Sequence, residues 1–369
     1  MTQKKLILFM PSIEGGGVEK NFVIISNYLG KKFKLTQLIT ADKAHSKLFK
    51  KLKIINPSFK LNSFYPRRLK YFFCLIELIK LITKEKNYVV FAFQANVYCA
   101  LICKILNIKL IIRSNTSPSG WKLNFFRKKI FKILLSLPNE IIVNSLEFKN
   151  EYKSKFNLNP ICILNPLDKD TIKEKSNEKI RFDFFQNYKG LKIIFIGRLV
   201  DQKDPLTFLK ALSFIKNKIN FRAVIIGKGY LYKDLKKFIE INDLSKQIKI
   251  INWKKNPYPY IKQSDTLVLT SKYEGLPNTL LEAIVLKKFI ISTKCPTGPK
   301  EILDYGKGGE LIEINDYKNL SKKIIEYNKN KKKFYKKVLF ANERLARFNY
   351  NKNLNKYSDI AKKYILHGK

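Results

Sequence analysis

Long apolar stretches are missing from this sequence of 369 residues. No run reaches the roughly 18 uninterrupted apolar residues of a membrane-spanning helix. The apolar run at 97–112 is broken by Lys104 and Lys109, which indicates a core helix followed by a strand. Lys4 and Lys5 precede too short an apolar run for a signal peptide. We therefore expect a cytoplasmic protein that is not integral to the membrane.

Cysteine and histidine are scarce as well. The five cysteines have no paired spacing apart from Cys99 and Cys103, which lie one helical turn apart. The two histidines, His45 and His367, are not near these cysteines in the sequence. We therefore expect buried free thiols in a reducing compartment in preference to a shared metal face.

Acidic residues are few, with 29 Asp and Glu against 73 Lys and Arg, which gives a formal charge of +44. Such a charge attracts polyanions over a long range, whether nucleic acid, an anionic membrane or a diphosphate lipid. A second explanation of the excess is compositional, because the chain is rich in the Lys, Asn, Ile, Phe and Tyr that A+T-rich genomes encode. We discount a physical role of the charge for that reason without discarding it.

Two segments, 64–73 and 121–131, interleave basic residues with large aromatic ones. Such mixtures suit a surface that lies in the headgroup region of a membrane. The same pattern also fits amphipathic helices that cover a sheet and turn their lysines to water. Membrane docking and a solvated helix face both remain open at this point.

Strand-like runs alternate with helical patterns along the whole chain, which predicts parallel sheets wrapped by helices. The length suits two domains. A polar, charged stretch at 165–190 separates two α/β series, and we place the interdomain linker there. The predicted strands are 5–10, 35–40, 88–93, 109–113, 140–144 and 161–164 in the first series, and 192–196, 223–227, 248–252, 266–270 and 289–291 in the second.

Two glutamates flank a Gly-Leu-Pro turn that leads from the strand at 266–270 into a predicted helix. Glu274 precedes the turn and Glu282 follows eight residues later. N–H groups at a helix N-terminus favour a diphosphate. We expect Glu282 to accept from a ribose and Glu274 to reach a sugar beyond the phosphates, although glutamates around a helix start are common and the motif depends on its context. The other residues predicted to bind the ligand there are Gly275, Leu276, Pro277, Asn278 and Thr279.

A second strand-to-helix turn carries two cations. The apolar strand at 192–196 is followed by Arg198 and, five residues later, by Lys203. Arg198 can fork onto phosphate oxygens, and Lys203 adds a point charge. In a lysine-rich chain such a pair is ordinarily solvated surface, but its position behind a buried strand favours binding of a nucleotide diphosphate.

Three glycines, Gly15, Gly16 and Gly17, separate the first strand from a helix predicted at 21–29. Glycines allow the backbone to approach a ligand closely and tolerate positive φ. The pattern is not G-x-G-x-x-G, so a nicotinamide-binding site is not indicated.

Together these motifs resemble the retaining glycosyltransferases of family 4, also called group 1, which have the GT-B fold. The E-x7-E segment and the G-R-L segment with its lysine match the two signatures of that family. The segment at 292–303 resembles the branch that builds bacterial lipid-linked oligosaccharides and surface polysaccharides, including transferases for N-acetylhexosamines and galactose. The resemblance covers nearly the whole chain, with the strongest motifs in the second half.

The resemblance implies two Rossmann-like parallel-sheet domains that face each other across a cleft. Residues 1–170 would form the acceptor-binding domain, with the C-terminal helix at 349–369 packed back on it. Residues 190–348 would form the nucleotide-sugar-binding domain.

The resemblance also implies a chemistry in which Arg198, Lys203 and Glu274 are catalytic. Arg198 and Lys203 would bind the diphosphate, Glu282 the ribose and Glu274 the hydroxyls of the donor sugar. Loss of the diphosphate develops negative charge, so fixed cations stabilise the transition state more than the ground state. No metal or other cofactor is then required. The sequence at 168–170 spells D-x-D, the metal motif of the other main glycosyltransferase fold, but it lies in the predicted linker and we take it as coincidence.

In the first domain, the resemblance places Gly16 and Gly17 near the donor phosphates and Glu19 on the acceptor side. Many family members carry a histidine in this domain that faces the donor sugar, and the matching loop here has none. Ser114 or Asn115 would take a hydrogen-bonding part of that role.

We therefore predict a retaining glycosyltransferase that moves a hexose or N-acetylhexosamine to a polyprenyl-diphosphate-linked or polysaccharide-precursor glycan. The expected donor is UDP-linked N-acetylhexosamine or galactose, with GDP-mannose second. We expect a peripheral protein on the anionic inner face of the cell membrane. One alternative is a nucleic-acid-binding protein, for which the sequence has no recognisable reading motif. Another is a non-catalytic sugar-binding protein, which would be expected to have lost Glu282 or Arg198.

Overall fold

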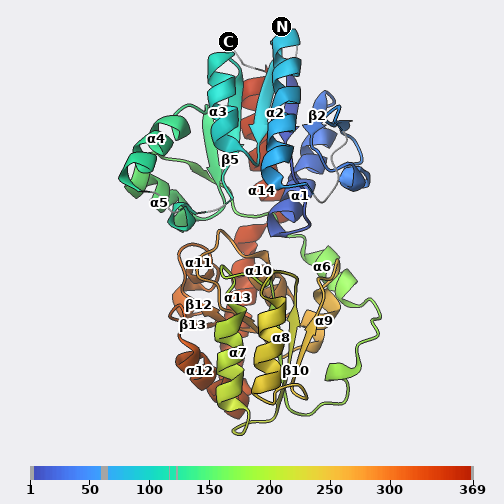
Figure 1. Cartoon of the computed structure of the whole chain (residues 1–369), viewed down its shortest axis with the longest axis vertical. Coiled ribbons are helices and arrows are strands. Elements are labelled where there is room, and N and C mark those ends of the chain that lie inside the picture. Colours follow the sequence, from blue (N-terminus) through green and yellow to red (C-terminus); the bar gives the residue numbers. More distant parts are fainter. Residues whose placement is uncertain (1–3, 60–64, 116, 122–123, 367–369) are drawn as a thin grey trace. The chain divides into compact units, whose positions relative to one another are not determined.

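The computed structural model describes residues 4–59, 65–115, 117–121 and 124–366. The chain forms two compact units (Figure 1). Residues up to 166 and from 350 onward make the first unit, and residues 167–349 make the second.

The first unit is built on a seven-stranded sheet with the order β3-β2-β1-β4-β5-β6-β7, in which every paired strand is parallel. Its central strands are runs of Val, Ile, Leu and Phe that are buried on both faces, as parallel strands covered by helices require. The strands are β1 (Lys5–Phe9), β2 (Thr36–Ile39), β3 (Lys53–Ile55), β4 (Tyr88–Ala92), β5 (Lys109–Arg113), β6 (Glu140–Val143) and β7 (Ile161–Cys162).

Helices cover both faces of this sheet. One core gathers side chains of α1 and α14, and the other gathers side chains of α2, α3 and α5. Helix α14 contacts α1, β1 and β4, so the C-terminal segment belongs to the first unit. The helices are α1 (Gly17–Lys32), α2 (Arg67–Lys84), α3 (Asn96–Ile105), α4 (Phe125–Leu135), α5 (Leu146–Phe156) and α14 (Tyr350–Leu366), with short 3-10 turns η1 (Lys43–Leu48) and η2 (Pro118–Gly120).

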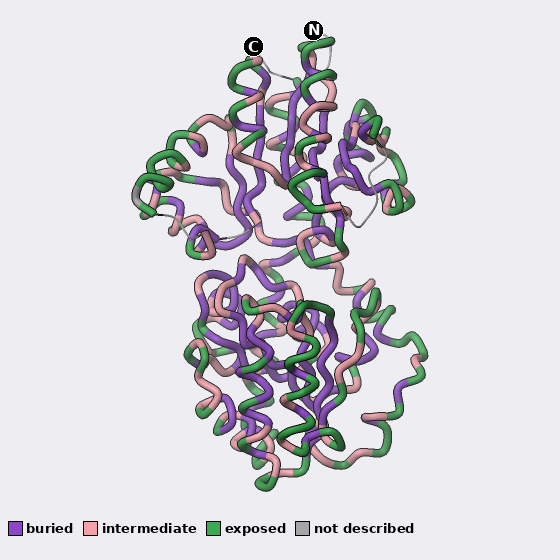
Figure 2. Tube along the Cα trace, in the orientation of Figure 1, coloured by how far each residue is buried: buried purple, intermediate pink, exposed green. Residues whose placement is uncertain are grey.

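The second unit is built on a six-stranded parallel sheet with the order β10-β9-β8-β11-β12-β13. Figure 2 shows its strands buried and its helices exposed along their outer sides. The strands are β8 (Leu191–Ile196), β9 (Phe221–Ile226), β10 (Ile248–Ile251), β11 (Thr266–Leu269), β12 (Phe289–Thr293) and β13 (Glu310–Ile312). The helices are α6 (Lys169–Ser176), α7 (Pro205–Ile215), α8 (Tyr232–Ile241), α9 (Tyr258–Gln263), α10 (Asn278–Val285), α11 (Pro299–Ile302), α12 (Tyr317–Lys329) and α13 (Lys331–Arg344), and the 3-10 turns are η3 (Asp183–Phe185), η4 (Asp304–Gly306) and η5 (Leu345–Phe348).

The segment predicted as a linker is part of the second unit instead, so the boundary prediction at 170 and 190 needs correction. Helix α6 packs against α9 and α10. Ile172 and Phe185 are buried, and the ring of Phe182 lies edge-on to that of Tyr260 at 5.0 Å. A few well-spaced apolar residues are enough to anchor this polar stretch, although they are too sparse to form a periodic pattern.

None of the helices in the described part of the chain combines the length and the apolar character needed to cross a bilayer.

Candidate functional site

The strand order of the second sheet has a switch point at β8. From β8 the chain moves outward through β9 and β10, then returns to pair β11 with the other side of β8. Ligands of open α/β sheets bind at such a switch point, outside the carboxyl ends of the strands. The loops that follow β8 and β11 carry Arg198, Lys203 and Glu274, so the topology brings these three predicted residues to the same edge.

Backbone-to-backbone contact fixes the loop that holds Arg198. A Cβ at Gly227, after β9, would collide with the carbonyl oxygen of Gly197, and a Cβ at Gly229 would collide with that of Leu199. The Leu199 N–H donates to the Lys228 carbonyl at 2.9 Å, which joins the two loops. The loop after β8 therefore has little room to move.

Lys203 and Glu274 form an ion pair at this edge. The side chains are only 16% and 7% exposed, so water screens the pair weakly. The Ser271 hydroxyl also donates to Oε1 of Glu274 at 2.5 Å. A bound diphosphate can take the ammonium as its partner while sugar hydroxyls donate to the carboxylate, so the two groups offer complementary contacts to a nucleotide sugar.

Arg198 is exposed at the same edge. Its Nη2 donates to Oε1 of Gln202 at 2.7 Å, and Nε2 of Gln202 donates to the Tyr273 carbonyl at 3.1 Å. Gln202 thus links the guanidinium to the loop that carries Glu274. Most of the five guanidinium N–H groups stay available to an anion.

The loop after β12 forms two hydrogen bonds with the backbone of Glu274. The Thr297 hydroxyl donates to the Glu274 carbonyl at 2.5 Å, and the Glu274 N–H donates to the Pro296 carbonyl at 3.3 Å. Gly298 has φ +88°, and a Cβ there would collide with the Gly275 carbonyl. The Pro- and Gly-rich segment after β12 therefore holds the backbone of Glu274 in position.

Helix α10 begins directly after the Gly-Leu-Pro turn. Its N-cap residue is Pro277, which has no side chain that could accept from the first N–H groups. Leu276 and Pro277 are buried, and Gly275, Asn278 and Thr279 are half-buried. The turn therefore presents mainly backbone groups, which suits the predicted contact with phosphate oxygens.

Glu282 lies in the second turn of α10 and is only 5% exposed. The Tyr258 hydroxyl of α9 donates to its Oε1 at 3.4 Å. The carboxylate is thus oriented by a neighbouring helix, and its contact with a ribose remains a prediction.

The predicted first-domain residues lie at the carboxyl edge of the first sheet, in a different unit from the residues above. Helix α1 begins at Gly17 with Gly16 as its N-cap, so Gly17 is helical and the helix starts four residues before the predicted position. Glu19 is 8% exposed and its Oε2 lies against Gly16. The Ser114 hydroxyl accepts from Tyr152 at 3.0 Å, and the Asn115 amide donates to the Phe93 carbonyl at 2.7 Å.

Sequence reasoning missed three positioning residues of the second unit, Ser271, Thr297 and Gln202. Two of them carry a signal that was available, because Ser271 and Thr297 follow the predicted strands β11 and β12 at their carboxyl ends. No such sequence signal exists for Gln202, because its partner Tyr273 is 71 residues away in the sequence.

The D-x-D sequence has a local explanation. Oδ1 of Asp168 accepts from the Thr171 N–H at 3.0 Å and Oδ2 accepts from its hydroxyl at 2.7 Å, so Asp168 caps α6. Within residues 4–59, 65–115, 117–121 and 124–366, no three His, Cys, Asp or Glu side chains are grouped as a metal ion would need.

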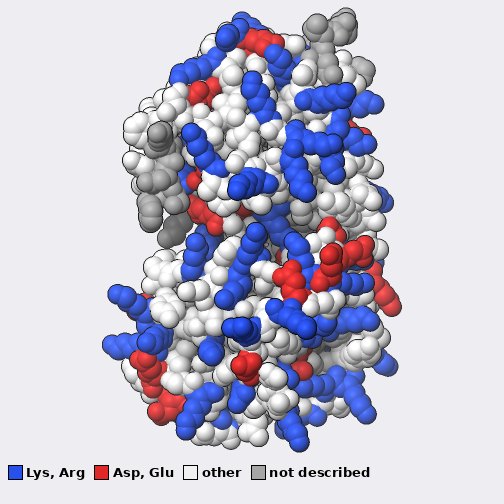
Figure 3. All heavy atoms as spheres, turned by 90° about the vertical axis from the view of Figure 1, so that its right-hand side faces the viewer, with Lys and Arg blue, Asp and Glu red and all other residues white. Residues whose placement is uncertain are grey.

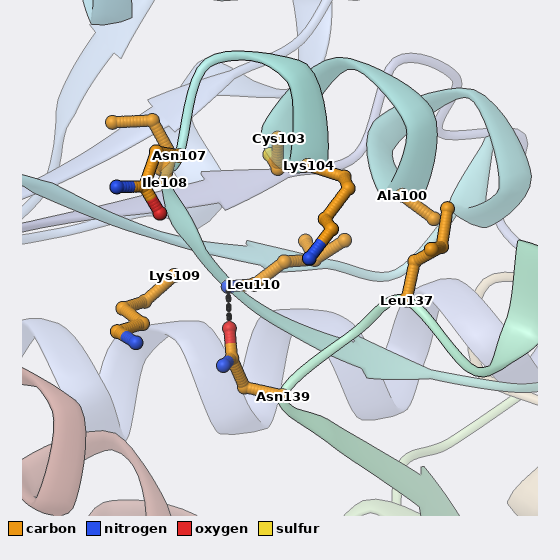
Figure 4. A pocket seen from close by; sticks show the side chains of 9 residues that line it. All are labelled: Ala100, Cys103, Lys104, Asn107, Ile108, Lys109, Leu110, Leu137 and Asn139. Carbon is orange, nitrogen blue, oxygen red and sulfur yellow. Dashed lines mark hydrogen bonds between the residues drawn. The ribbon is translucent and has the colours of Figure 1, made fainter.

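A pocket of about 110 Å³ lies in the first unit between the end of α3 and the start of β5 (Figure 4). Two of its lining residues are joined by a hydrogen bond, in which the Leu110 N–H donates to Oδ1 of Asn139 at 2.9 Å. Cys103 lines it, and burial raises the pKa of that thiol to about 12, so the sulfur is protonated at neutral pH. This pocket lies at the amino edge of the sheet, away from the edge where α/β sheets bind ligands.

Residues 176–344 match the sequence model of the family described as glycosyl transferases group 1. The second unit therefore belongs to the group 1 glycosyltransferases, and relatives of 25% and 24% identity extend the similarity over 87% and 91% of the chain. This membership makes it an enzyme of the hexosyltransferase class, and the predicted family is confirmed.

Curated relatives of this glycosyltransferase cover different shares of the chain. An uncharacterised glycosyltransferase of Methanocaldococcus jannaschii is 31% identical over 53% of this chain, and the match spans 51% of that relative. An α-1,4-N-acetyl-D-galactosaminyltransferase of Campylobacter jejuni, which acts on a diphospho-undecaprenol-linked GalNAc glycan, is 25% identical over 87% of this chain and 88% of its own length.

Solved structures share the fold. A glycosyltransferase from Rickettsia africae superposes with a TM-score of 0.78 at 18% identity, covering 100% of both chains. The Anabaena protein HepE in complex with UDP-glucose gives a TM-score of 0.77 at 14% identity, covering 98% of this chain and 100% of that one. The prediction of a GT-B protein with two parallel-sheet α/β domains is confirmed.

Replacing Ser271 with Ala should weaken the binding of a UDP-sugar about tenfold while leaving the binding of UDP unchanged. The reason is that the hydroxyl orients the Glu274 carboxylate, which is predicted to face the sugar, and a hydrogen bond to a charged group contributes roughly 1.5–3 kcal/mol. Calorimetric titration with UDP and with the UDP-sugar that binds the wild-type protein most tightly checks this.

Ser264→Ala is the matched control, because Ser264 is equally buried, donates to the Ile261 carbonyl and precedes β11 at the opposite edge. Equal loss of UDP and UDP-sugar affinity in Ser271→Ala would contradict the assigned role of Glu274.

Proposed function

We propose that this glycosyltransferase transfers a hexose or N-acetylhexosamine from a UDP-linked donor to a glycan carried on a polyprenyl diphosphate, with retention of configuration. The donor binds the second unit and the acceptor binds the first. UDP-N-acetylhexosamine or UDP-galactose is the proposed donor class.

The observation that carries the proposal is the pairing of Lys203 with Glu274 at the switch point of the second sheet, beside Arg198. A nucleotide sugar has negative charge on its diphosphate and hydroxyl donors on its sugar. The site has cations and a carboxylate in the corresponding positions, and α10 begins after Pro277, which provides no side-chain cap. A hydride-transfer or proton-abstraction site would not require two cations and a carboxylate beside the start of a helix.

The reacting group is the diphosphate that leaves the donor sugar. Charge builds on its oxygens as the glycosidic bond breaks, and Arg198 and Lys203 stabilise that charge most in the transition state. Glu274 holds the sugar by its hydroxyls. Since two fixed cations already face the diphosphate, the proposal includes no metal ion.

The acceptor assignment is supported by the relatives. The Campylobacter jejuni enzyme acts on an undecaprenol diphosphate glycan, and an Escherichia coli relative that is 29% identical over 45% of this chain is a galactosyltransferase acting on GlcNAc-diphosphoundecaprenol.

Arg198→Ala should lower kcat for sugar transfer at least about 100-fold, because preorganised charges at a leaving group contribute on that scale. Glu282→Gln should raise the KM for the donor about tenfold, because it replaces a charged acceptor of the proposed ribose hydrogen bond with a neutral one. Transfer is measured as UDP release from UDP-sugars in the presence of a diphospho-polyprenol glycan, with EDTA present throughout. Lys210→Ala, an exposed cation on α7, is the control for general loss of positive charge.

Near-normal turnover in Arg198→Ala, or an unchanged donor KM in Glu282→Gln, would contradict the assigned site. A strict requirement for a divalent metal would contradict the metal-independent chemistry.

We also propose that the first unit docks on an anionic membrane through α4 and its neighbour α3. Helix α4 exposes Phe126 and Ile130 at 70% and 39%, and the three basic residues between them, Arg127, Lys128 and Lys129, are also exposed. Helix α3 packs against α4 and exposes Tyr98 and Ile105 at 58% and 71%. Apolar side chains beside lysines are complementary to an anionic lipid surface.

The basic residues of the predicted segment at 64–73 contribute less to such a surface than expected. Lys70 is 3% exposed and pairs with Asp42 at 2.7 Å, and Arg67 pairs with Glu14 at 2.5 Å. Phe64, Lys122 and Leu123 of the two predicted segments lie outside the described residues.

The +44 charge by itself does not identify a partner. Figure 3 shows Lys and Arg side chains spread over both units. A dispersed charge gives only non-specific affinity for nucleic acid, and no other feature of the described residues favours that alternative.

Replacing Phe126 and Ile133, which are 70% and 63% exposed, with Ser should reduce co-sedimentation with phosphatidylglycerol-containing vesicles several-fold, because it removes two largely exposed apolar side chains of α4 and leaves its charges. Serines in place of Phe214 and Ile241, which are 48% and 69% exposed in the second unit, are the matched control. Unchanged sedimentation of the α4 variant, or an equal loss in the control, would show that α4 is an ordinary solvated helix.

A further inference from the structure

Arg113 ends β5 in the first unit and is 1% exposed, which makes it the largest fully buried side chain of the described residues. It lies at the carboxyl edge of the sheet, directly before Ser114 and Asn115. A guanidinium stays protonated in proteins, so the position holds a full positive charge in the interior.

The partners of this guanidinium are all neutral. Nε donates to the Tyr357 hydroxyl of α14 at 2.9 Å, Nη2 donates to Oδ1 of Asn165 at 2.8 Å, and Nη1 donates to Oδ1 of Asn115. No ion pair joins Arg113 to any carboxylate in the described residues. Every Asp and Glu of the chain falls within those residues.

A buried charge without a counter-ion is costly. Hydrogen bonds to neutral oxygens recover part of the lost hydration, whereas a buried ion is ordinarily paired. Asn165 has the length and shape of an aspartate, and an aspartate there would supply the missing charge. The protein instead keeps the positive charge uncompensated beside a loop at the ligand-binding edge of the sheet.

Asn115 connects this charge to the surface. Its carboxamide oxygen accepts from Arg113, and one amide N–H donates to the Phe93 carbonyl at 2.7 Å. The other N–H makes only a 3.5 Å contact with the Arg113 carbonyl. Asn115 is half-buried, and its amide is polarised by the guanidinium on the oxygen side.

We propose that Arg113 makes the loop after β5 a binding position for a phosphate group of a substrate, with Asn115 as the contact residue and Arg113 as the positioning residue. The second amide N–H of Asn115 donates to a phosphate oxygen. The anion supplies the counter-charge that the interior lacks. This inference rests on the proposed function, in which both the donor and the lipid-linked acceptor carry a diphosphate.

The test is Asn165→Asp, which keeps the oxygen that accepts from Arg113 and adds the missing negative charge without changing the volume. The variant should melt at or above the wild-type temperature, because the guanidinium gains a counter-ion. KM should rise about tenfold for an acceptor glycan on a polyprenyl diphosphate, while KM for the same glycan on an uncharged alkyl chain stays unchanged.

The two sources of phosphate give different results. A rise confined to the diphosphate acceptor identifies the acceptor as the source, and a rise in donor KM with both acceptors identifies the donor. Tyr357→Phe is the matched control, because it removes another partner of Arg113 without changing any charge; it should lower stability and alter none of these KM values.

Unchanged KM values for donor and both acceptors in Asn165→Asp would overturn the inference and leave Arg113 as a structural tie to α14. Calorimetry with UDP separates this outcome from failure of the proposed function. If the wild-type protein binds UDP and transfers sugar but Asn165→Asp has no effect, only the role of Arg113 is contradicted. If the wild-type protein neither binds UDP nor transfers sugar, the proposed function itself is contradicted.

Discussion

The ion pair between Lys203 and Glu274 is the contact on which the second unit's site depends. Both side chains are largely covered, so removing either would leave a poorly hydrated charge without a partner, which ordinarily costs several kcal/mol. The surrounding hydroxyls of Ser271 and Thr297 hold the carboxylate and its backbone in place. A ligand that displaces this pair must therefore offer an anion to the lysine and donors to the glutamate together, and a sugar attached to a diphosphate does so.

The pair exists only because of the strand order. Lys203 and Glu274 are 71 residues apart, and they meet because β8 and β11 are adjacent although β9 and β10 lie between them in the chain. The sequence predicts that both loops follow buried strands, and resemblance to the glycosyltransferases predicts that they share a ligand. The hydrogen bonds of Gln202 and Thr297, in contrast, are set by tertiary packing of loops whose local sequences are ordinary turns.

This difference between local sequence patterns and tertiary packing also explains where prediction from the sequence was wrong or incomplete. The polar stretch around α6 has no clear periodicity, so its burial against α9 could not be predicted. Lys70 lies in a basic, aromatic segment that predicts a surface residue, but its side chain is buried in an ion pair with Asp42. Arg113 has partners 52 and 244 residues away, one of them on a helix that returns from the C-terminal end. Strands and motif order come from local patterns, whereas these polar contacts come from long-range topology.

The central claim is that fixed cations of the second unit bind a nucleotide diphosphate without a metal ion. Calorimetric titration of the wild-type protein with UDP and with UMP, both in EDTA, tests it most directly. If Arg198 and Lys203 contact the second phosphate, UDP should bind at least about tenfold more tightly than UMP, because two charge-assisted contacts are lost with that phosphate. Equal affinity for the two nucleotides, or binding of UDP only after a divalent metal is added, would contradict the account.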